Sequence, residues 1–150
     1  MKQSKLWDAA IHEAAHLVVY VKAGGRGTGV FKVRIYDNGD GAIFTPYIYQ
    51  LQNAIVADAA ITAAGIACEQ IRGLEPCTRR GSDTHTLHDI LWNDAQEQLT
   101  ITLTRHWLET NWHHVERTAQ RLVDARKRKG SVPHRAVREI VKELASHLRP

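Results

Sequence analysis

Cysteine is scarce in this sequence, and its two cysteines exclude two common kinds of small domain. A disulfide-rich scaffold needs several cysteine pairs, whereas these 150 residues contain only Cys68 and Cys77. The two cysteines do not form a C-x-x-C pair, which excludes a recognisable cysteine-type zinc site. So little cysteine is typical of a reducing compartment, and we therefore expect a cytoplasmic protein.

Long hydrophobic runs are also missing. The longest apolar stretch, from Ala54 to Cys68, covers about 15 residues and contains Asp58 and Thr62. A membrane span needs about 20 apolar residues. The first residues, MKQSKLWDAAIHEAAH, are polar and carry charges throughout, unlike a secretory signal. We therefore expect no transmembrane segment and no secretory leader.

No internal repeat or low-complexity segment interrupts the chain, and its composition is that of an ordinary globular protein. Hydrophobic residues make up 43% and charged residues 24% of the sequence, which disfavours a disordered chain. A length of 150 residues suffices for one domain with a core of its own. We therefore expect a single domain over residues 1–150.

Two periodicities divide the chain into helices and one hairpin. Between residues 30 and 48, Phe31, Val33 and Ile35 alternate with more polar residues, and a turn cluster follows them. Pro46 ends the second strand or places it at an edge.

Helical spacing of apolar residues predicts helices over 5–22, 51–72, 82–109, 112–129 and 133–147. Ser4 is the predicted N-cap of the first helix, and the alanine-rich second helix is predicted to be the central buried one. The expected fold is mainly α (α+β), with about five helices and one small β-hairpin.

The first predicted helix contains the run HEAAH, which has the HExxH pattern. Residues four apart lie on the same face of a helix, so His12 and His16 can bind one zinc ion. Glu13 lies beside them and can act as general base on water that the ion activates, then pass the proton to a leaving amine. Such a match arises by chance roughly 0.03 times in a chain of this composition. The pattern therefore predicts a hydrolytic zinc site on this helix.

A catalytic zinc site also needs a third protein ligand. The motif does not continue as HExxHxxGxxH, so a third histidine directly after it is excluded. The candidates are carboxylates and imidazoles on the second and third predicted helices: Glu69, Asp83, His85, His88 and Asp89. The residues alone leave these five alternatives open.

The order of four segments resembles the peptidase domain of the FtsH-type ATP-dependent zinc proteases. The chain has AIHEAAHLVVY, then a hairpin, then ITAAGIACEQIRG, then GSDTHTL. The family has an HEAGHA helix, a strand pair, an AGRAAEE-type helix and a GASNDL-type segment. The resemblance covers about residues 7–145. It departs from the family at Ala15, where the family has glycine, and in the shortened GSDTHTL segment.

The resemblance implies a role for each matching residue. In that family the two motif histidines and the later aspartate bind Zn²⁺, and the motif glutamate is the general base. Carried over, the implied ligands are His12, His16 and Asp83, and the implied base is Glu13. Glu69 matches the conspicuous glutamate of the AGRAAEE-type helix, which implies a supporting role outside the ligand set. The alternative is a helix-end carboxylate paired with Arg72.

The sequence contains no GxxxxGK[ST] phosphate loop, so it lacks the ATPase pattern that the family combines with this domain. The resemblance therefore implies a zinc metalloendopeptidase without its own unfolding motor. Its partners would be peptide or protein substrates, cleaved at flexible or unfolded segments, and a separate ATPase or regulator. Ring assembly in the family suggests a homo-oligomer, although the ATPase that organises the rings is missing from this sequence.

The net charge of +4 is unevenly distributed along the chain. Residues 1–110 contain 10 Lys/Arg and 12 Asp/Glu, whereas residues 111–150 contain 10 and 4. A basic tail can bind nucleic acid or an acidic protein, which gives an alternative function as a non-catalytic, zinc-containing regulatory module. Basic helix faces are more often simply solvated, and we therefore expect the peptidase rather than this module.

Overall fold

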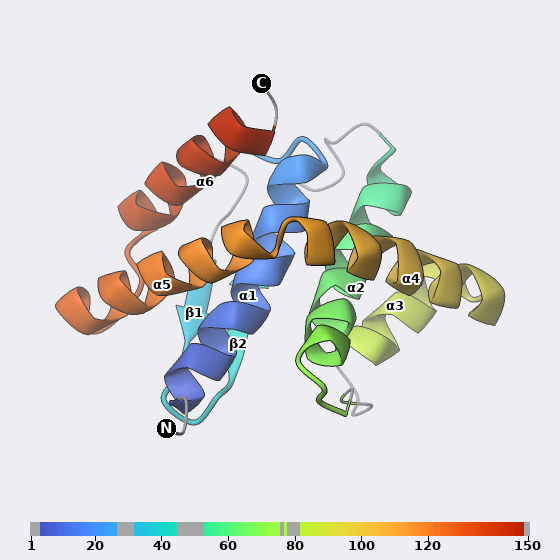
Figure 1. Ribbon diagram of the computed structural model, residues 1–150, viewed down its shortest axis with the longest axis horizontal. Coiled ribbons are helices and arrows are strands. Elements are labelled where there is room, and N and C mark those ends of the chain that lie inside the picture. The colour runs from blue at the N-terminus through green and yellow to red at the C-terminus, as the bar shows by residue number, and fades with distance from the viewer. Residues whose placement is uncertain (1–3, 27–31, 45–52, 76, 78–81, 149–150) are drawn as a thin grey trace.

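Six helices and one two-stranded hairpin form the described part of a computed structural model of the chain (Figure 1). The described residues are 4–26, 32–44, 53–75, 77 and 82–148. In chain order the elements are α1 (Lys5–Lys22), β1 (Lys32–Ile35), β2 (Gly41–Phe44), α2 (Ala54–Ile71), α3 (Asp83–Leu91), α4 (Asp94–Thr110), α5 (Trp112–Lys129) and α6 (His134–Leu148). The predicted fold, mainly α with one small hairpin, is confirmed.

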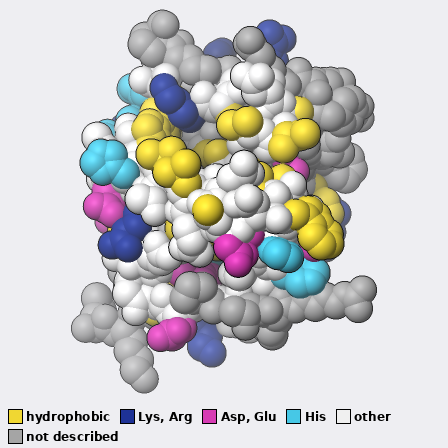
Figure 2. Space-filling view, turned by 90° about the vertical axis from the view of Figure 1, so that its right-hand side faces the viewer, with side chains coloured by type: hydrophobic (Ala, Val, Ile, Leu, Met, Phe, Trp, Pro, Cys, Tyr) yellow, Lys and Arg dark blue, Asp and Glu magenta, His cyan; other side chains and the backbone are white. Residues whose placement is uncertain are grey.

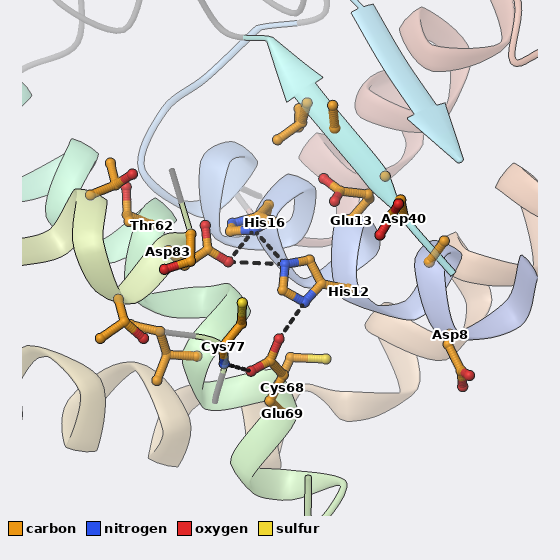
Figure 3. Close-up of a pocket in the computed structure, with 18 of the residues that line it drawn as sticks. Asp8, His12, Glu13, His16, Asp40, Thr62, Cys68, Glu69, Cys77 and Asp83 are labelled. Atoms are coloured by element: carbon orange, nitrogen blue, oxygen red, sulfur yellow. Dashed lines mark hydrogen bonds and ion pairs between the residues drawn. The ribbon is translucent and has the colours of Figure 1, made fainter. Parts of the chain in front are cut away.

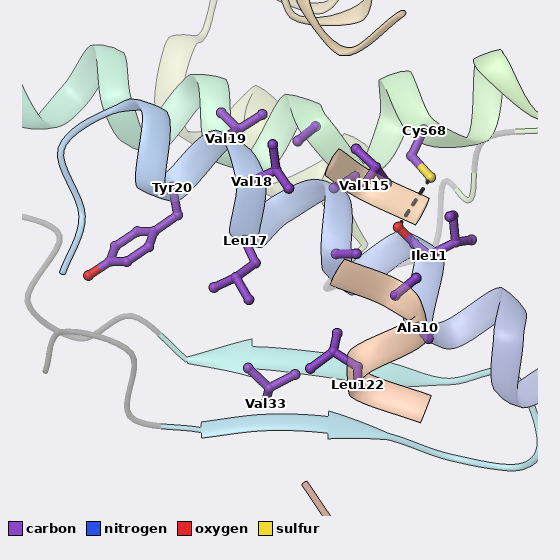
Figure 4. Close-up of a cluster of buried hydrophobic side chains, with 14 of the residues drawn as sticks. Ala10, Ile11, Leu17, Val18, Val19, Tyr20, Val33, Cys68, Val115 and Leu122 are labelled. Atoms are coloured by element: carbon purple, nitrogen blue, oxygen red, sulfur yellow. Dashed lines mark hydrogen bonds between the residues drawn. The ribbon is translucent and has the colours of Figure 1, made fainter. Parts of the chain in front are cut away.

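Helix α1 lies at the centre of the fold and packs against α2, α5, α6 and both strands. It begins where the sequence predicts, because the Ser4 side chain accepts a hydrogen bond from the backbone N–H of Trp7 at 3.2 Å. Leu17 of α1, Val33 of β1 and Leu122 of α5 belong to one buried cluster (Figure 4). A helix packed on all these sides is held rigidly, and this helix carries the HEAAH run.

Helix α2 is less central than its alanine-rich sequence predicts. Its first turn exposes Ile55 and Val56, whose relative exposures are 70% and 68%. Val56 and Leu103 of α4 line a shallow apolar groove, and other exposed hydrophobic side chains are visible on the α3–α4 side of the molecule (Figure 2). By length and composition α2 could cross a membrane, but more than half of it is buried inside the fold. Packing against α1, α3 and α4 therefore also accounts for its apolar sequence.

The prediction of one long third helix is wrong, because α3 and α4 are separate. Helix α3 ends at Leu91, and Trp92 takes a left-handed backbone conformation with φ of 53°. Asn93 then caps α4 by accepting a hydrogen bond from the backbone N–H of Gln96 at 2.9 Å. An asparagine that can cap a new helix competes locally with continuation of the old one.

The hairpin lies against α1 and ends beside the pocket described below. Its strands are antiparallel, with Ile35 opposite Gly41. Val33 and Ile35 are buried in the main core cluster, which confirms the predicted alternation. Phe31 and Pro46, which the sequence also assigned to the strands, lie outside the described residues. Strand β2 contacts α1 and contributes Gly41 to the wall of the pocket.

Candidate metal centre

The two motif histidines point into the same space beside α1. His12 and His16 lie one turn apart, and their Nε2 atoms are 3.2 Å apart (Figure 3). His16 is buried, and its Nδ1 lies 2.6 Å from the backbone carbonyl of Ile61 on α2. Because a carbonyl oxygen only accepts hydrogen bonds, Nδ1 carries the hydrogen and donates it. In the neutral ring this leaves the lone pair on Nε2, which is the atom that faces His12.

Asp83 adds a carboxylate oxygen to the two imidazole nitrogens. Its Oδ2 lies 2.9 Å from Nε2 of His12 and 3.2 Å from Nε2 of His16 (Figure 3). Asp83 is the first residue of α3, and the preceding Ser82 caps this helix by accepting a hydrogen bond from the backbone N–H of His85 at 3.3 Å. The cap fixes the start of α3. The structure thus brings together the three residues that the resemblance implied as ligands.

The other four candidates for the third ligand lie outside this group. Glu69 faces the opposite nitrogen of His12, with Oε1 at 3.5 Å from Nδ1. His85 and Asp89 pair with each other at 3.5 Å. His88 pairs at 3.2 Å with a glutamate of α4. These three residues do not line the pocket that holds the two histidines, and among the candidates on α3 only Asp83 lies against them.

The spacing of the three donor atoms fits a zinc ion. Tetrahedral zinc with ligand bonds of about 2.0–2.1 Å holds its ligand atoms about 3.3 Å apart. The three distances here are 2.9, 3.2 and 3.2 Å. Two imidazoles and one carboxylate are also ligands that zinc accepts, and a set of three leaves a fourth position for water or substrate. The donor set therefore has the composition of a catalytic site rather than a closed structural one.

Gly65 of α2 gives these donor atoms their space. A Cβ atom on this residue would lie 1.9 Å from Oδ2 of Asp83 and 2.7 Å from Nε2 of His16. Any side chain here would fill the place where the three donor atoms converge. Gly65 is not among the site residues predicted from the sequence, although a signal was present. A glycine inside an alanine-rich helix costs about 1 kcal/mol relative to alanine, which often marks a close approach.

The charges around the three residues favour a cation. Burial alone would lower the pKa of His16, but the adjacent Asp83 carboxylate raises it to about 10. Burial raises the pKa of Asp83, yet His16 and His12 together hold it well below its usual range. The aspartate is therefore ionised at neutral pH and draws positive charge onto its neighbours. A divalent cation can replace the protons on the imidazoles and satisfy the same carboxylate.

Glu13 is a buried carboxylate beside this group. Its relative exposure is 4%, and its Oε2 has no hydrogen-bond partner in the part of the chain that the structure describes. Burial raises the pKa of Glu13, opposed by the two nearby histidines. A Cβ atom on Gly41 of β2 would lie 2.8 Å from Cγ of Glu13, so the strand lies directly against the side chain (Figure 3). An unpaired buried carboxylate is costly, and such groups occur where a ligand or a reaction uses them.

Glu69 lies against His12 on the side opposite to Asp83. Its Oε2 accepts a hydrogen bond from the backbone N–H of Cys77 at 3.3 Å, while Oε1 faces the imidazole. Arg72, the partner that the sequence offered as an alternative, pairs with Asp8 at 2.6 Å. A carboxylate in this position orients the ring of a metal-binding histidine. The geometry therefore agrees with the supporting role that the resemblance implied for Glu69.

The group lies in a pocket of about 570 Å³ between α1, α2, α3 and β2. His12 and Asp83 keep about a quarter of their side-chain surface exposed, with values of 24% and 27%. The donor atoms can therefore be reached from the pocket. Its volume is within the range of small-ligand sites.

No protein-family model matches the chain, and neither a curated protein nor a solved structure similar to it was found. The chemistry of the site therefore rests on the residues that form it.

Proposed function

We propose that this chain is a zinc metallopeptidase of the HExxH type, which hydrolyses peptide bonds in flexible or unfolded polypeptides. One observation carries the proposal. Two imidazole nitrogens and the carboxylate oxygen of Asp83 lie within 3.2 Å of one another in a pocket, beside the buried carboxylate of Glu13. Structural zinc sites are closed by four protein ligands, whereas three ligands in a pocket leave room for substrate.

Five side chains of the site would have separate roles in peptide hydrolysis. His12, His16 and Asp83 would hold zinc, which when bound supplies Lewis-acid chemistry that polarises a peptide carbonyl and acidifies water. Glu13 accepts the proton of the attacking water and delivers it to the nitrogen of the leaving amine. Because burial raises the pKa of Glu13, this carboxylate can hold the proton between the two steps. Glu69 keeps the ring of His12 in place.

The resemblance to the FtsH-type proteases supports the same ligand set and the same base. Because this sequence contains no phosphate-loop pattern, we infer that the domain does not unfold its substrates by itself. Flexible segments would enter the pocket directly. A folded substrate would need a separate ATPase or regulator.

The alternative, a regulatory module that binds nucleic acid or an acidic protein through its basic helices, has less support. Arg117 and Arg121 of α5 both pair with Glu143 of α6. Arg126 lies 3.8 Å from Asp37 of the hairpin. Part of the basic charge thus lies beside carboxylates of neighbouring elements instead of forming a free positive surface.

Zinc content and proteolysis measured on one preparation test the proposal. We expect about one zinc per chain and cleavage of an unfolded protein such as casein. Glu13→Gln keeps the size of the side chain and should retain the fold and the zinc, while hydrolysis falls on the order of 10²-fold or more. A zinc-loaded Glu13→Gln protein that cleaves as fast as the wild type would contradict the peptidase assignment. Salt-sensitive retention of nucleic acid without proteolysis would instead favour the regulatory module.

A further inference from the structure

One stripe of α2 forms a wall of the pocket. Residues at helical spacing along this face lie within one narrow arc: Asp58, Thr62, Gly65, Glu69 and Arg72. Arg72, which follows the last residue of α2, is paired with Asp8, and Glu69 lies against His12. Gly65 faces the donor atoms. Asp58 lies at the other end of the stripe, beyond the metal ligands.

Asp58 is the charged member of this stripe that has no partner among the described residues. It is half-buried and lines the same pocket as His12 and His16. Burial raises the pKa of Asp58, and no neighbouring charge opposes the shift. A carboxylate that is partly removed from water without compensation is stabilised by any cation that reaches it.

The spacing of Asp58 and Gly65 along α2 matches the reach of a basic side chain in a bound peptide. Asp58 and Gly65 are seven residues apart, which is about 10.5 Å along a helix. One residue of extended chain covers about 3.5 Å, and the long stems of lysine and arginine can cover the rest. Thr62, which lies between the two positions on the stripe, has a short polar side chain.

We propose that Asp58 forms a subsite for a lysine or arginine side chain, so that the chain cleaves within two residues of a basic residue. The inference rests on the proposed peptidase function and names its substrate class. The other charges of the pocket agree with it. Asp40 of the hairpin also lines the pocket, and Arg72, the only Lys or Arg among the described lining residues, is paired with Asp8. Such a pocket attracts cationic peptides.

Mass spectrometry of cleavage products from a mixture of random-sequence peptides tests the subsite. With the zinc-loaded wild type we expect lysine and arginine to be enriched at one fixed position within two residues of the cut. Asp58→Asn should remove this enrichment, and Asp58→Lys should replace it with enrichment of aspartate and glutamate. Asp124→Asn is the matched control. It removes one carboxylate from the exposed face of α5, where the partner is Gln120, and should leave the preference unchanged.

A binding measurement gives a readout without turnover. Glu13→Gln is titrated into two fluorescent peptides that differ only in lysine or norleucine at the preferred position, and anisotropy is recorded. The lysine peptide should bind on the order of 10-fold more tightly, because hydrogen bonds to charged groups are the stronger class. Adding Asp58→Asn should abolish the difference.

The outcomes separate the subsite from the proposed function. Cleavage without preference for basic residues, or a preference that survives Asp58→Asn, would overturn the subsite and leave the peptidase standing. No cleavage by the wild type, together with no peptide binding by Glu13→Gln, would overturn both.

Discussion

Gly65 and Asp83 approach so closely that a single methyl group at residue 65 would lie 1.9 Å from Oδ2 of the aspartate. Such a separation is far inside van der Waals contact, and the nearby Nε2 of His16 would be at 2.7 Å. Helix α2 can therefore lie against the three donor atoms only because residue 65 has no side chain. The space between the donor atoms thus depends on a residue that has no side chain.

Gly65→Ala should abolish zinc binding while the helices remain. Alanine is favoured over glycine in a helix by about 1 kcal/mol, so α2 itself gains. The added methyl group must push Asp83 and His16 apart, which breaks the spacing that a tetrahedral ion needs. We expect helical circular dichroism close to that of the wild type and zinc content well below one per chain after dialysis. Full zinc content in this variant would show that the three side chains do not converge on one ion.

Gly41→Ala should separate catalysis from metal binding. The new Cβ atom would lie 2.8 Å from Cγ of Glu13 and 3.0 Å from the carbonyl oxygen of Arg34. We expect Glu13 to be displaced, so that peptide hydrolysis falls more than 10-fold, on the scale of a lost general base, while zinc stays bound. Phe44→Ala on the same strand, where the side chain is exposed, is the control and should retain activity. Equal activity of Gly41→Ala and wild type would argue against Glu13 as the base.

Asp83→Asn and Glu69→Gln should differ in their effect on zinc affinity. Asp83 contributes a donor atom, and its loss leaves two imidazoles, so we expect no zinc to survive dialysis against a weak chelator. Glu69 only orients His12, and loss of such a partner typically weakens metal binding by about 10- to 100-fold. Chelator competition on the purified variants measures both. Asp89→Asn, on the exposed part of α3, should bind zinc like the wild type. Equal affinity loss in Asp83→Asn and Glu69→Gln would mean that Asp83 is not a ligand.

Features that depend only on residues close together in the sequence could be predicted from it. Helix α1 runs from Lys5 to Lys22 as predicted, because Ser4 is a strong cap and the apolar spacing continues to its end. The pairing of His12 with His16 follows from the pitch of any helix. Asp83 was predicted as a ligand only from the order of the motifs in the resemblance, since no local rule connects it with residues about 70 positions earlier.

The features that the sequence did not reveal depend on packing between distant segments. The close approaches at Gly41 and Gly65, where a side chain would not fit, exist only because β2 and α2 lie against α1. The break at Trp92 required a choice between a continuous helix and a new one capped by Asn93, and helical periodicity is satisfied by both. The central position of α1 rather than α2 likewise depends on the helices that cover it.

Cys68 should be inert in the folded protein. Its thiol is buried against the backbone carbonyl of Ile11, and burial raises its pKa to about 12. Only the thiolate reacts with alkylating reagents. In a Cys77→Ser variant we therefore expect alkylation at pH 8 to be roughly 10³-fold slower in the folded than in the denatured chain. Rapid labelling under native conditions would show that the contact between α1 and α2 opens easily.

Anomalous diffraction at the zinc absorption edge, from crystals of the zinc-loaded protein, shows directly whether His12, His16 and Asp83 bind one zinc ion. We expect one strong peak per chain, at about 2.0–2.2 Å from Nε2 of His12, Nε2 of His16 and a carboxylate oxygen of Asp83. We also expect Glu13 to lie close to this peak without contacting it. A peak at another group of residues, or no peak at full zinc loading, would contradict the assignment of this site and the peptidase chemistry that depends on it.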